Sequence, residues 1–258
     1  QQCGPRRKRI HGVPVARAVI PAQKVENGTV TIEVIEGRID RTTFTGNKLY
    51  STAFLQRWAA PLIGKTVQVA ALEERVLTLN DLPGLQTQAV LIPGLEYGTT
   101  TTEFLATEKQ YDGEISLNNY GRPEIGRTRI DANANLNNPF GIGDQLGVRT
   151  SVSEHGLLKL GGINYSLPLN TDGTRLALSY THIRYGIGGE LASLDIQGKS
   201  QLASATVIHP FLRSAAQNLY GTFAMRSFSG KQSALDVELS KSRVSVFEAG
   251  AAWNHIDE

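Results

Sequence analysis

A long alternation of apolar and polar residues, running from about residue 113 to the C-terminal region, constrains this chain more than any other feature. In its clearest stretch, Thr128, Ile130, Ala132, Ala134 and Leu136 take one parity, and Arg127, Arg129, Asp131, Asn133 and Asn135 take the other. Successive side chains of a β-strand point to opposite faces of the sheet. The alternation therefore predicts a strand with one apolar face and one polar face.

Eight segments of this zone are predicted to be strands, each bounded by turn residues. They are Gly113–Asn118, Arg127–Leu136, Gln145–Ser153, Leu158–Leu167, Thr174–Ile183, Lys199–Ile208, Asn218–Phe228 and Arg243–Asn254. We expect short turns at one end of these strands, at residues 137–144, 170–173 and 210–214, and longer loops at the other end, at 119–126, 185–198 and 230–242. Short connections at one end and longer ones at the other are typical of outer-membrane barrels.

The chemistry of the two parities favours a membrane barrel over a soluble β-sandwich or jelly roll, which is the alternative. The apolar parity includes small residues such as Ala132 and Ala134, whereas a sandwich core is filled by larger side chains. The polar parity carries charges, which suit the wet interior of a barrel whose outer face meets lipid. The residues expected to line that interior are Arg127, Arg129, Asp131, Asn133, Arg149, Arg175 and Arg226.

The N-terminal zone mixes strand and helix patterns. Predicted strands cover residues 28–37, 38–44, 86–92 and 100–107, and predicted helices cover 53–58 and 66–80. Ser51 and Thr52 offer side-chain oxygens to begin the first helix, and Pro61 ends it. Apolar residues at helical spacing make the second helix amphipathic: Val69, Leu72, Val76 and Leu79. The order predicts a compact α+β unit in which two helices cover one sheet.

Several function classes have no support in the residues. No nucleophile elbow or phosphate loop is present, so an enzyme is not expected. The single cysteine, Cys3, and five widely spaced histidines predict neither a metal site nor a cofactor. Lys and Arg (26) nearly balance Asp and Glu (24), so nucleic acid is not an expected partner. The sequence has no run of about 18 apolar residues, so a transmembrane helix is not predicted.

Several motifs resemble the transporters of two-partner secretion, the haemolysin-activator or filamentous-haemagglutinin transporter family. Residues 16–23 and 28–39 resemble the end of that family's first POTRA domain, and residues 77–84 with 92–94 resemble its second. Residues 118–121, 126–127 and 137–144 are similar to its first barrel hairpin and the turn that follows. The resemblance runs from about Val15 to the end of the chain.

The resemblance implies a fold and a cellular location. The fold class is a small α+β POTRA domain followed by a partial antiparallel transmembrane β-barrel, with about eight of about sixteen strands. Residues 1–37 would end a first POTRA domain, residues 38–108 would form a second, and residues 109–258 would form the N-terminal half of the barrel. The barrel would lie in the bacterial outer membrane, in contact with its lipid, with the POTRA part in the periplasm. The family's inward-folding loop is expected beyond Glu258.

The resemblance also implies export of an unfolded partner exoprotein. An exposed sheet edge can bind an extended chain through unpaired backbone N–H and C=O groups. The segment expected to form that edge is Thr87, Gln88, Ala89 and Val90, with a groove beside the helix Val67–Leu79 for alternate side chains. Two other interpretations remain open. One is an outer-membrane protein assembly factor of the same superfamily, and the other is a soluble all-β binding module.

Overall fold

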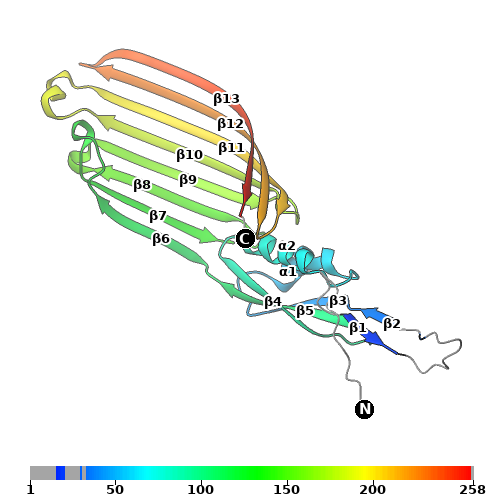
Figure 1. The fold of residues 1–258 in the computed structure, drawn as a ribbon. Coiled ribbons are helices and arrows are strands. Elements are labelled where there is room, and N and C mark those ends of the chain that lie inside the picture. The colour runs from blue at the N-terminus through cyan, green and yellow to red at the C-terminus, as the bar shows by residue number, and fades with distance from the viewer. Residues whose placement is uncertain (1–15, 21–29, 31–32, 257–258) are drawn as a thin grey trace. The chain divides into compact units, whose positions relative to one another are not determined.

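A computed structural model describes residues 16–20, 30 and 33–256 of the chain (Figure 1). The contacts divide the chain into two compact units, the first made mainly of residues up to Glu108 and the second mainly of residues from Lys109 onward. The predicted end of a first POTRA domain, residues 1–37, falls mostly outside the described residues.

The first unit is a three-stranded sheet with helices packed on it. Its elements are β3 (Arg38–Thr45), α1 (Thr52–Ala59), the 3-10 turn η1 (Ala60–Leu62), α2 (Val69–Asn80), β4 (Leu85–Pro93) and β5 (Thr99–Glu108). The strand order is β3-β5-β4, with β3 parallel and β4 antiparallel to β5. A separate antiparallel pair joins β1 (Ala16–Val19) to β2 (Glu33–Glu36).

Both predicted helices are present, but the second differs in its limits and its buried face. Ser51 begins α1, because its side chain accepts a hydrogen bond from the Phe54 N–H. The predicted start of α2 at residue 66 is wrong, since the helix begins at Val69, which is 52% exposed. Its buried residues include Thr78 and Leu79, because α2 packs against both α1 and β4. In the described part of the chain, no helix has the length and apolar character needed to cross a membrane.

The core of this unit forms where the helices meet the central strand. Phe104 of β5 is fully buried and stacks on Phe44 of β3 with ring centroids 4.9 Å apart. Leu55 and Tyr50 are also fully buried. The Glu108 carboxylate, at the end of β5, accepts hydrogen bonds from the backbone N–H groups of residues 48, 49 and 50, at 2.6, 2.5 and 3.0 Å. This contact fixes the loop that leads into α1.

The second unit is one eight-stranded antiparallel sheet in which every strand pairs with its neighbours in sequence, as the alternation predicted. Its strands are β6 (Tyr111–Asn118), β7 (Arg129–Asn137), β8 (Gln145–Ser153), β9 (Leu158–Pro168), β10 (Arg175–Gly186), β11 (Gln197–Arg213), β12 (Gln217–Ala234) and β13 (Val237–His255). Short 3-10 turns lie in the connections at residues 123–125, 154–156 and 189–194.

Two predicted connections are wrong because the last strands are longer than their alternation showed. The expected loop at residues 230–242 is a continuation of β12 and β13, joined only by Leu235 and Asp236. Both residues have positive φ, 47° and 61°, as a type I′ hairpin turn requires. The sequence hides this turn because Leu-Asp lacks the Asn-Gly signature. The expected turn at residues 210–214 is also shorter, since β11 passes through Pro210 and ends at Arg213.

We predict that Phe104→Ala lowers the free energy of unfolding of the first unit by about 3–5 kcal/mol, because it removes a fully buried aromatic ring. The matched control is Leu105→Ala on the opposite face of β5, where the side chain is 42% exposed, with an expected change of about 0.5 kcal/mol. Urea unfolding followed by Trp58 fluorescence, in a Trp253→Phe background, measures both. Equal losses in the two variants would contradict this assignment of the core.

Candidate functional site

The eight-stranded sheet has two chemically different faces, fixed by the pairing register. One face, here called the polar face, carries a continuous ladder of residues that are directly opposite one another on six successive strands. From β6 to β11 the ladder is Asp112, Asn135, Gly147, Asn164, Ser179 and Ser204. Asn135 donates to the Asp112 carboxylate at 2.8 Å, and the Ser179 and Ser204 hydroxyls are 2.8 Å apart.

Glycines in this face make room for longer polar side chains. A Cβ at Gly147 would lie 2.5–2.6 Å from amide atoms of Asn164 and Asn135, so only glycine leaves space for both. Gly162 plays the same part for Arg149, which is its direct partner on β8. The Arg149 side chain passes over β9 at Gly162 and donates to the Thr181 hydroxyl on β10 at 2.8 Å.

The other residues expected to line a barrel interior lie as follows. Asp131 shares the polar face and accepts a hydrogen bond from Asn118 at 2.6 Å, while Asn133 is the register partner of Arg149. Arg175 donates to the Ser166 hydroxyl at 3.2 Å. Arg226 pairs with Glu248 at 3.3 Å.

Arg129 and Arg127 depart from this scheme in part. Arg129 begins β7 on the polar face, and its Nε is buried with no partner among the described residues. Arg127 precedes β7, in the connection from β6, so strand alternation does not set the direction of its side chain. Its backbone N–H donates to the Glu154 carboxylate at 2.7 Å.

The opposite face, here called the apolar face, presents large hydrophobic side chains that remain accessible. Val148 and Ile163 are direct partners and are 50% and 48% exposed. Ile130 and Leu178, on the same face, are 55% and 40% exposed. A water-soluble protein rarely leaves so extended an apolar surface uncovered, whereas a sheet that faces hydrocarbon requires one.

In the first unit, β4 lies at an edge of the sheet. The edge is blocked at Thr87, because the Asn80 side chain accepts the Thr87 N–H at 2.6 Å and donates to the Thr87 carbonyl at 3.4 Å. Backbone groups of an antiparallel strand alternate between its two sides. Ala89 and Leu91 therefore direct their N–H and C=O groups away from β5, while those of Gln88 and Val90 point toward it.

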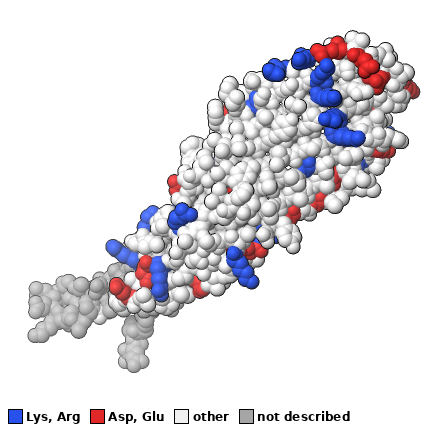
Figure 2. All heavy atoms as spheres, turned by 180° about the vertical axis from the view of Figure 1, so that it is seen from behind, with Lys and Arg blue, Asp and Glu red and all other residues white. Residues whose placement is uncertain are grey.

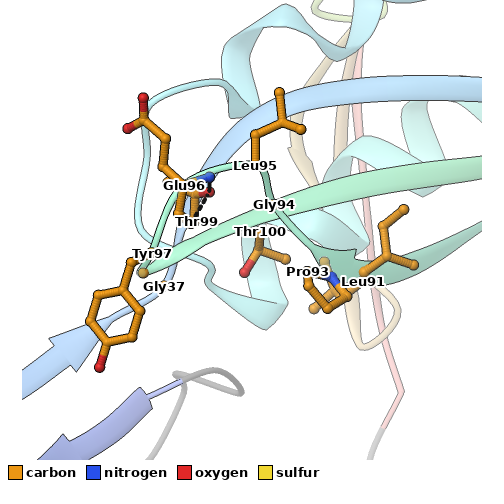
Figure 3. Close-up of a pocket in the computed structure, with 11 residues that line it drawn as sticks. Gly37, Leu91, Pro93, Gly94, Leu95, Glu96, Tyr97, Thr99 and Thr100 are labelled. Atoms are coloured by element: carbon orange, nitrogen blue, oxygen red, sulfur yellow. Dashed lines mark hydrogen bonds between the residues drawn. The ribbon is translucent and has the colours of Figure 1, made fainter.

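The open part of this edge leads to a hollow of about 540 Å³ at the end of β4 (Figure 3). The hollow is lined by the end of β4, the start of β5, the loop between them and Gly37. Two large loop side chains, Leu95 and Tyr97, are 78% and 76% exposed. An extended chain added beside Leu91 would thus continue toward an accessible apolar and aromatic surface.

Asp40 of β3 holds this loop in place. Its carboxylate accepts the Leu95 N–H at 3.1 Å and the Thr101 hydroxyl at 2.9 Å. Burial alone would raise the pKa of Asp40, but these hydrogen bonds, with those from Arg41 and its charge, outweigh burial and lower the pKa. The ionised carboxylate is therefore the form that fixes the loop.

The residues chosen from sequence for the edge are partly brought into position. Gln88 and Val90 expose their side chains on one side of β4, and Ala89 offers backbone groups at the edge, but Thr87 is occupied by Asn80. The alternation pattern gives no indication of Leu91, Asp40 or the loop surface at Leu95 and Tyr97. The available signal was the pair of turn motifs, Pro93-Gly94 and Tyr97-Gly98, which indicates an exposed loop that carries large side chains.

Comparison with known proteins relates both units to one group. A family model described as "Haemolysin secretion/activation protein ShlB/FhaC/HecB" matches residues 105–257. The heme/hemopexin transporter protein HuxB of Haemophilus influenzae is 28% identical over 251 residues, covering 95% of this chain and 44% of HuxB. The hemolysin transporter protein HpmB of Proteus mirabilis is 24% identical over 200 residues, covering 76% of this chain and 31% of HpmB. The chain thus spans less than half the length of these relatives.

Solved structures show the same fold. CdiB from Escherichia coli superposes with a TM-score of 0.79 at 20% identity, over 95% of this chain and 47% of CdiB. BamA from Haemophilus ducreyi lacking POTRA domains 1–3 superposes with a TM-score of 0.56 at 14% identity, over 95% of this chain and 50% of that protein. At these identities the likeness concerns the fold alone.

We predict that Asp40→Ala speeds hydrogen exchange of the Leu95 amide by at least about tenfold, because a hydrogen bond to a charged acceptor is lost. The control is Glu96→Gln, an exposed carboxylate in the same loop, which should leave the rate unchanged. Amide exchange read by NMR separates the two. Unchanged exchange in Asp40→Ala would show that the loop is held by other contacts.

The contribution of Asp40 to the stability of the folded protein falls at low pH. Because the pKa of Asp40 is lower in the folded protein than its usual value, its contribution to stability is complete above that usual value and is lost as pH falls through the lowered pKa. We expect the Leu95 amide shift to titrate with a midpoint below the usual range for aspartate. A midpoint at or above that range would contradict the assignment.

Proposed function

We propose, from the premise that this chain belongs to the haemolysin secretion/activation family ShlB/FhaC/HecB, that it forms part of an outer-membrane transporter that exports a large partner exoprotein. The observation that carries this proposal is the two-faced sheet. Its apolar face leaves Val148 and Ile163 50% and 48% exposed, and its polar face is bound together by hydrogen bonds across the strands.

The sheet is proposed to be half of a closed barrel of about sixteen strands. A sheet in lipid must pair both of its edges, because an unpaired backbone group in hydrocarbon costs several kcal/mol. The polar face would then line the interior and present both signs of charge together with an amide. The side chains concerned are those of Asp131, Asn133, Arg149, Arg175 and Arg226. Such a wall solvates a passing unfolded chain without holding it, and it calls for no cofactor and no enzymatic step.

The first unit is proposed to be a POTRA domain in the periplasm, spanning residues 38–108, and residues 1–37 are proposed to end a preceding one. Its binding site for the exported chain would be the open edge of β4. Ala89 and Leu91 offer backbone groups there, and the hollow beside Leu95 and Tyr97 would take side chains that follow. Backbone pairing at an edge gives affinity with little demand on sequence, which suits a long substrate.

The alternatives left open by the sequence have less support. An assembly factor of the outer membrane is favoured only by the likeness to BamA, whose TM-score of 0.56 is below the 0.79 found for CdiB. HuxB and HpmB are themselves called transporters. A soluble all-β module would bury its apolar face, whereas Ile130 is 55% exposed.

We predict that Ala89→Pro reduces export of a co-expressed partner exoprotein into the medium by at least about tenfold. Proline removes an N–H that points away from β5, so the edge loses one of its two outward donors while the sheet is retained. Gln88→Ala, which removes an exposed neighbouring side chain and leaves the backbone intact, is the control and should export normally.

Membrane insertion and protein level are measured in the same cells. Wild-type export by Ala89→Pro, at an equal level of inserted protein, would contradict the proposed role of the β4 edge. If Ala89→Pro lowers the level of inserted protein, a second variant, Leu91→Pro, provides the test, because it removes the next outward N–H of the same strand. Export that survives in both variants rejects strand addition at this edge.

A further inference from the structure

The apolar face of the sheet carries a row of cations near one end of its strands. Lys159 of β9, Arg184 of β10 and Lys199 of β11 are direct register partners, so three cations lie side by side on neighbouring strands. All three side chains are exposed. Lys231 and Lys241 are direct partners on β12 and β13. Figure 2 shows Lys and Arg side chains gathered in a band near the end of the sheet that lies toward the top of the view.

The alternation of the strands places these cations on the face that carries the hydrophobic residues. Arg184 shares its parity with Leu178 and Tyr180 on β10, and Lys159 shares its parity with Ile163 on β9. On β12, Lys231 has the parity of Met225. The cations therefore form the border of the apolar face, at the strand ends next to the connections 187–196 and 235–236.

The other end of the same face has a different character. There Leu136 of β7 is opposite Leu146 of β8, and Leu167 of β9 is opposite Leu176 of β10. Tyr165 of β9 is the partner of Leu146. The cationic end is the one farther along β6 from the point where the chain enters the sheet, since β6 begins at Tyr111 and runs toward Asn118. Lys159, Arg184 and Lys199 thus lie at the border opposite these leucines.

This arrangement is unfavourable without an external anion. Like charges directly opposite each other on neighbouring strands destabilise a sheet. Among the described residues, no carboxylate forms an ion pair with Lys159, Arg184 or Lys199. Lys231 is compensated by Glu238 at 2.7 Å. Arg184 donates a hydrogen bond to the His182 ring at 2.9 Å, which brings no negative charge. The first three cations are therefore the part of the band whose charge is left uncompensated by ion pairs among the described residues.

We propose that Lys159, Arg184 and Lys199 form a binding surface for phosphorylated lipid headgroups in the leaflet that borders this end of the apolar face. The inference rests on the proposed membrane location. Long cationic side chains at the border of a hydrophobic surface extend to the headgroup layer while their stems cover apolar neighbours. Neighbouring strands are about 4.8 Å apart, so the three cations span about 10 Å. That span fits adjacent lipid phosphates or a headgroup with several phosphates.

The test compares flotation of the protein with two kinds of vesicle, phosphatidylcholine alone and phosphatidylcholine with phosphatidic acid as a minor component. Wild type should gain affinity from phosphatidic acid. The variant Lys159→Gln, Arg184→Gln, Lys199→Gln should lose on the order of 100-fold of affinity, since each cation near a charged membrane contributes about fivefold. The control Lys48→Gln, Lys65→Gln, Lys109→Gln removes the same charge elsewhere and should bind phosphatidic acid within about twofold of wild type.

The outcomes separate this proposal from the proposed function. Equal gains from phosphatidic acid in wild type and in the first variant would overturn the headgroup site and leave membrane insertion intact. Abolition of the gain by millimolar inorganic phosphate, beyond the effect of sodium chloride at equal ionic strength, would also overturn it in favour of a free-anion site. Failure of wild type to float with either vesicle would overturn both proposals. Circular dichroism confirms that the variants retain the sheet.

Discussion

Direct register between sequential antiparallel strands is the constraint on which the rest of this structure depends. Because side chains alternate with a period of two, the pairing of each strand with its neighbour decides which residues share a face. A slip of β8 against β9 by one residue would bring Arg149 opposite Ile163 in place of Gly162 and turn the polar ladder of β8 toward the apolar face. The hydrogen bonds from Asn135 to Asp112 and from Arg149 to Thr181 act against that slip, because each joins residues that meet only in this register.

The two faces of the sheet are therefore stabilised in different ways. On the polar face, glycine at positions 147 and 162 leaves room for amide and guanidinium groups over a neighbouring strand, so the side chains of Asn135 and Arg149 form hydrogen bonds across the sheet. The apolar face instead presents large side chains such as Val148 and Ile163, which are 50% and 48% exposed and would gain a favourable environment from hydrocarbon. The cations at one border of this face agree with the same arrangement, because charge is tolerated where hydrocarbon ends and lipid headgroups begin.

Unpaired backbone links the first unit to the proposed function. A free edge strand is a hazard in most proteins and is usually covered. Here the cover is partial, because Asn80 occupies Thr87 and leaves Ala89 and Leu91 open. Asp40, from the other edge strand, positions the loop at the far end of β4 through Leu95. A short free edge that ends at a fixed loop is a site that can accept an extended chain while resisting uncontrolled sheet growth.

The sequence by itself determined the eight strands, their antiparallel order, the two parities and the strand–helix–helix–strand–strand order of the first unit. These follow from local periodicity, which a single chain displays directly. It did not determine the length of β12 and β13, since the type I′ turn at Leu235 and Asp236 depends on backbone φ values that these residue types do not advertise. Nor did it show that Asn80 caps Thr87 or that Lys159, Arg184 and Lys199 stand in one row. Those facts arise from contacts between residues distant in sequence, and only the tertiary structure, by fixing register and edges, decided them.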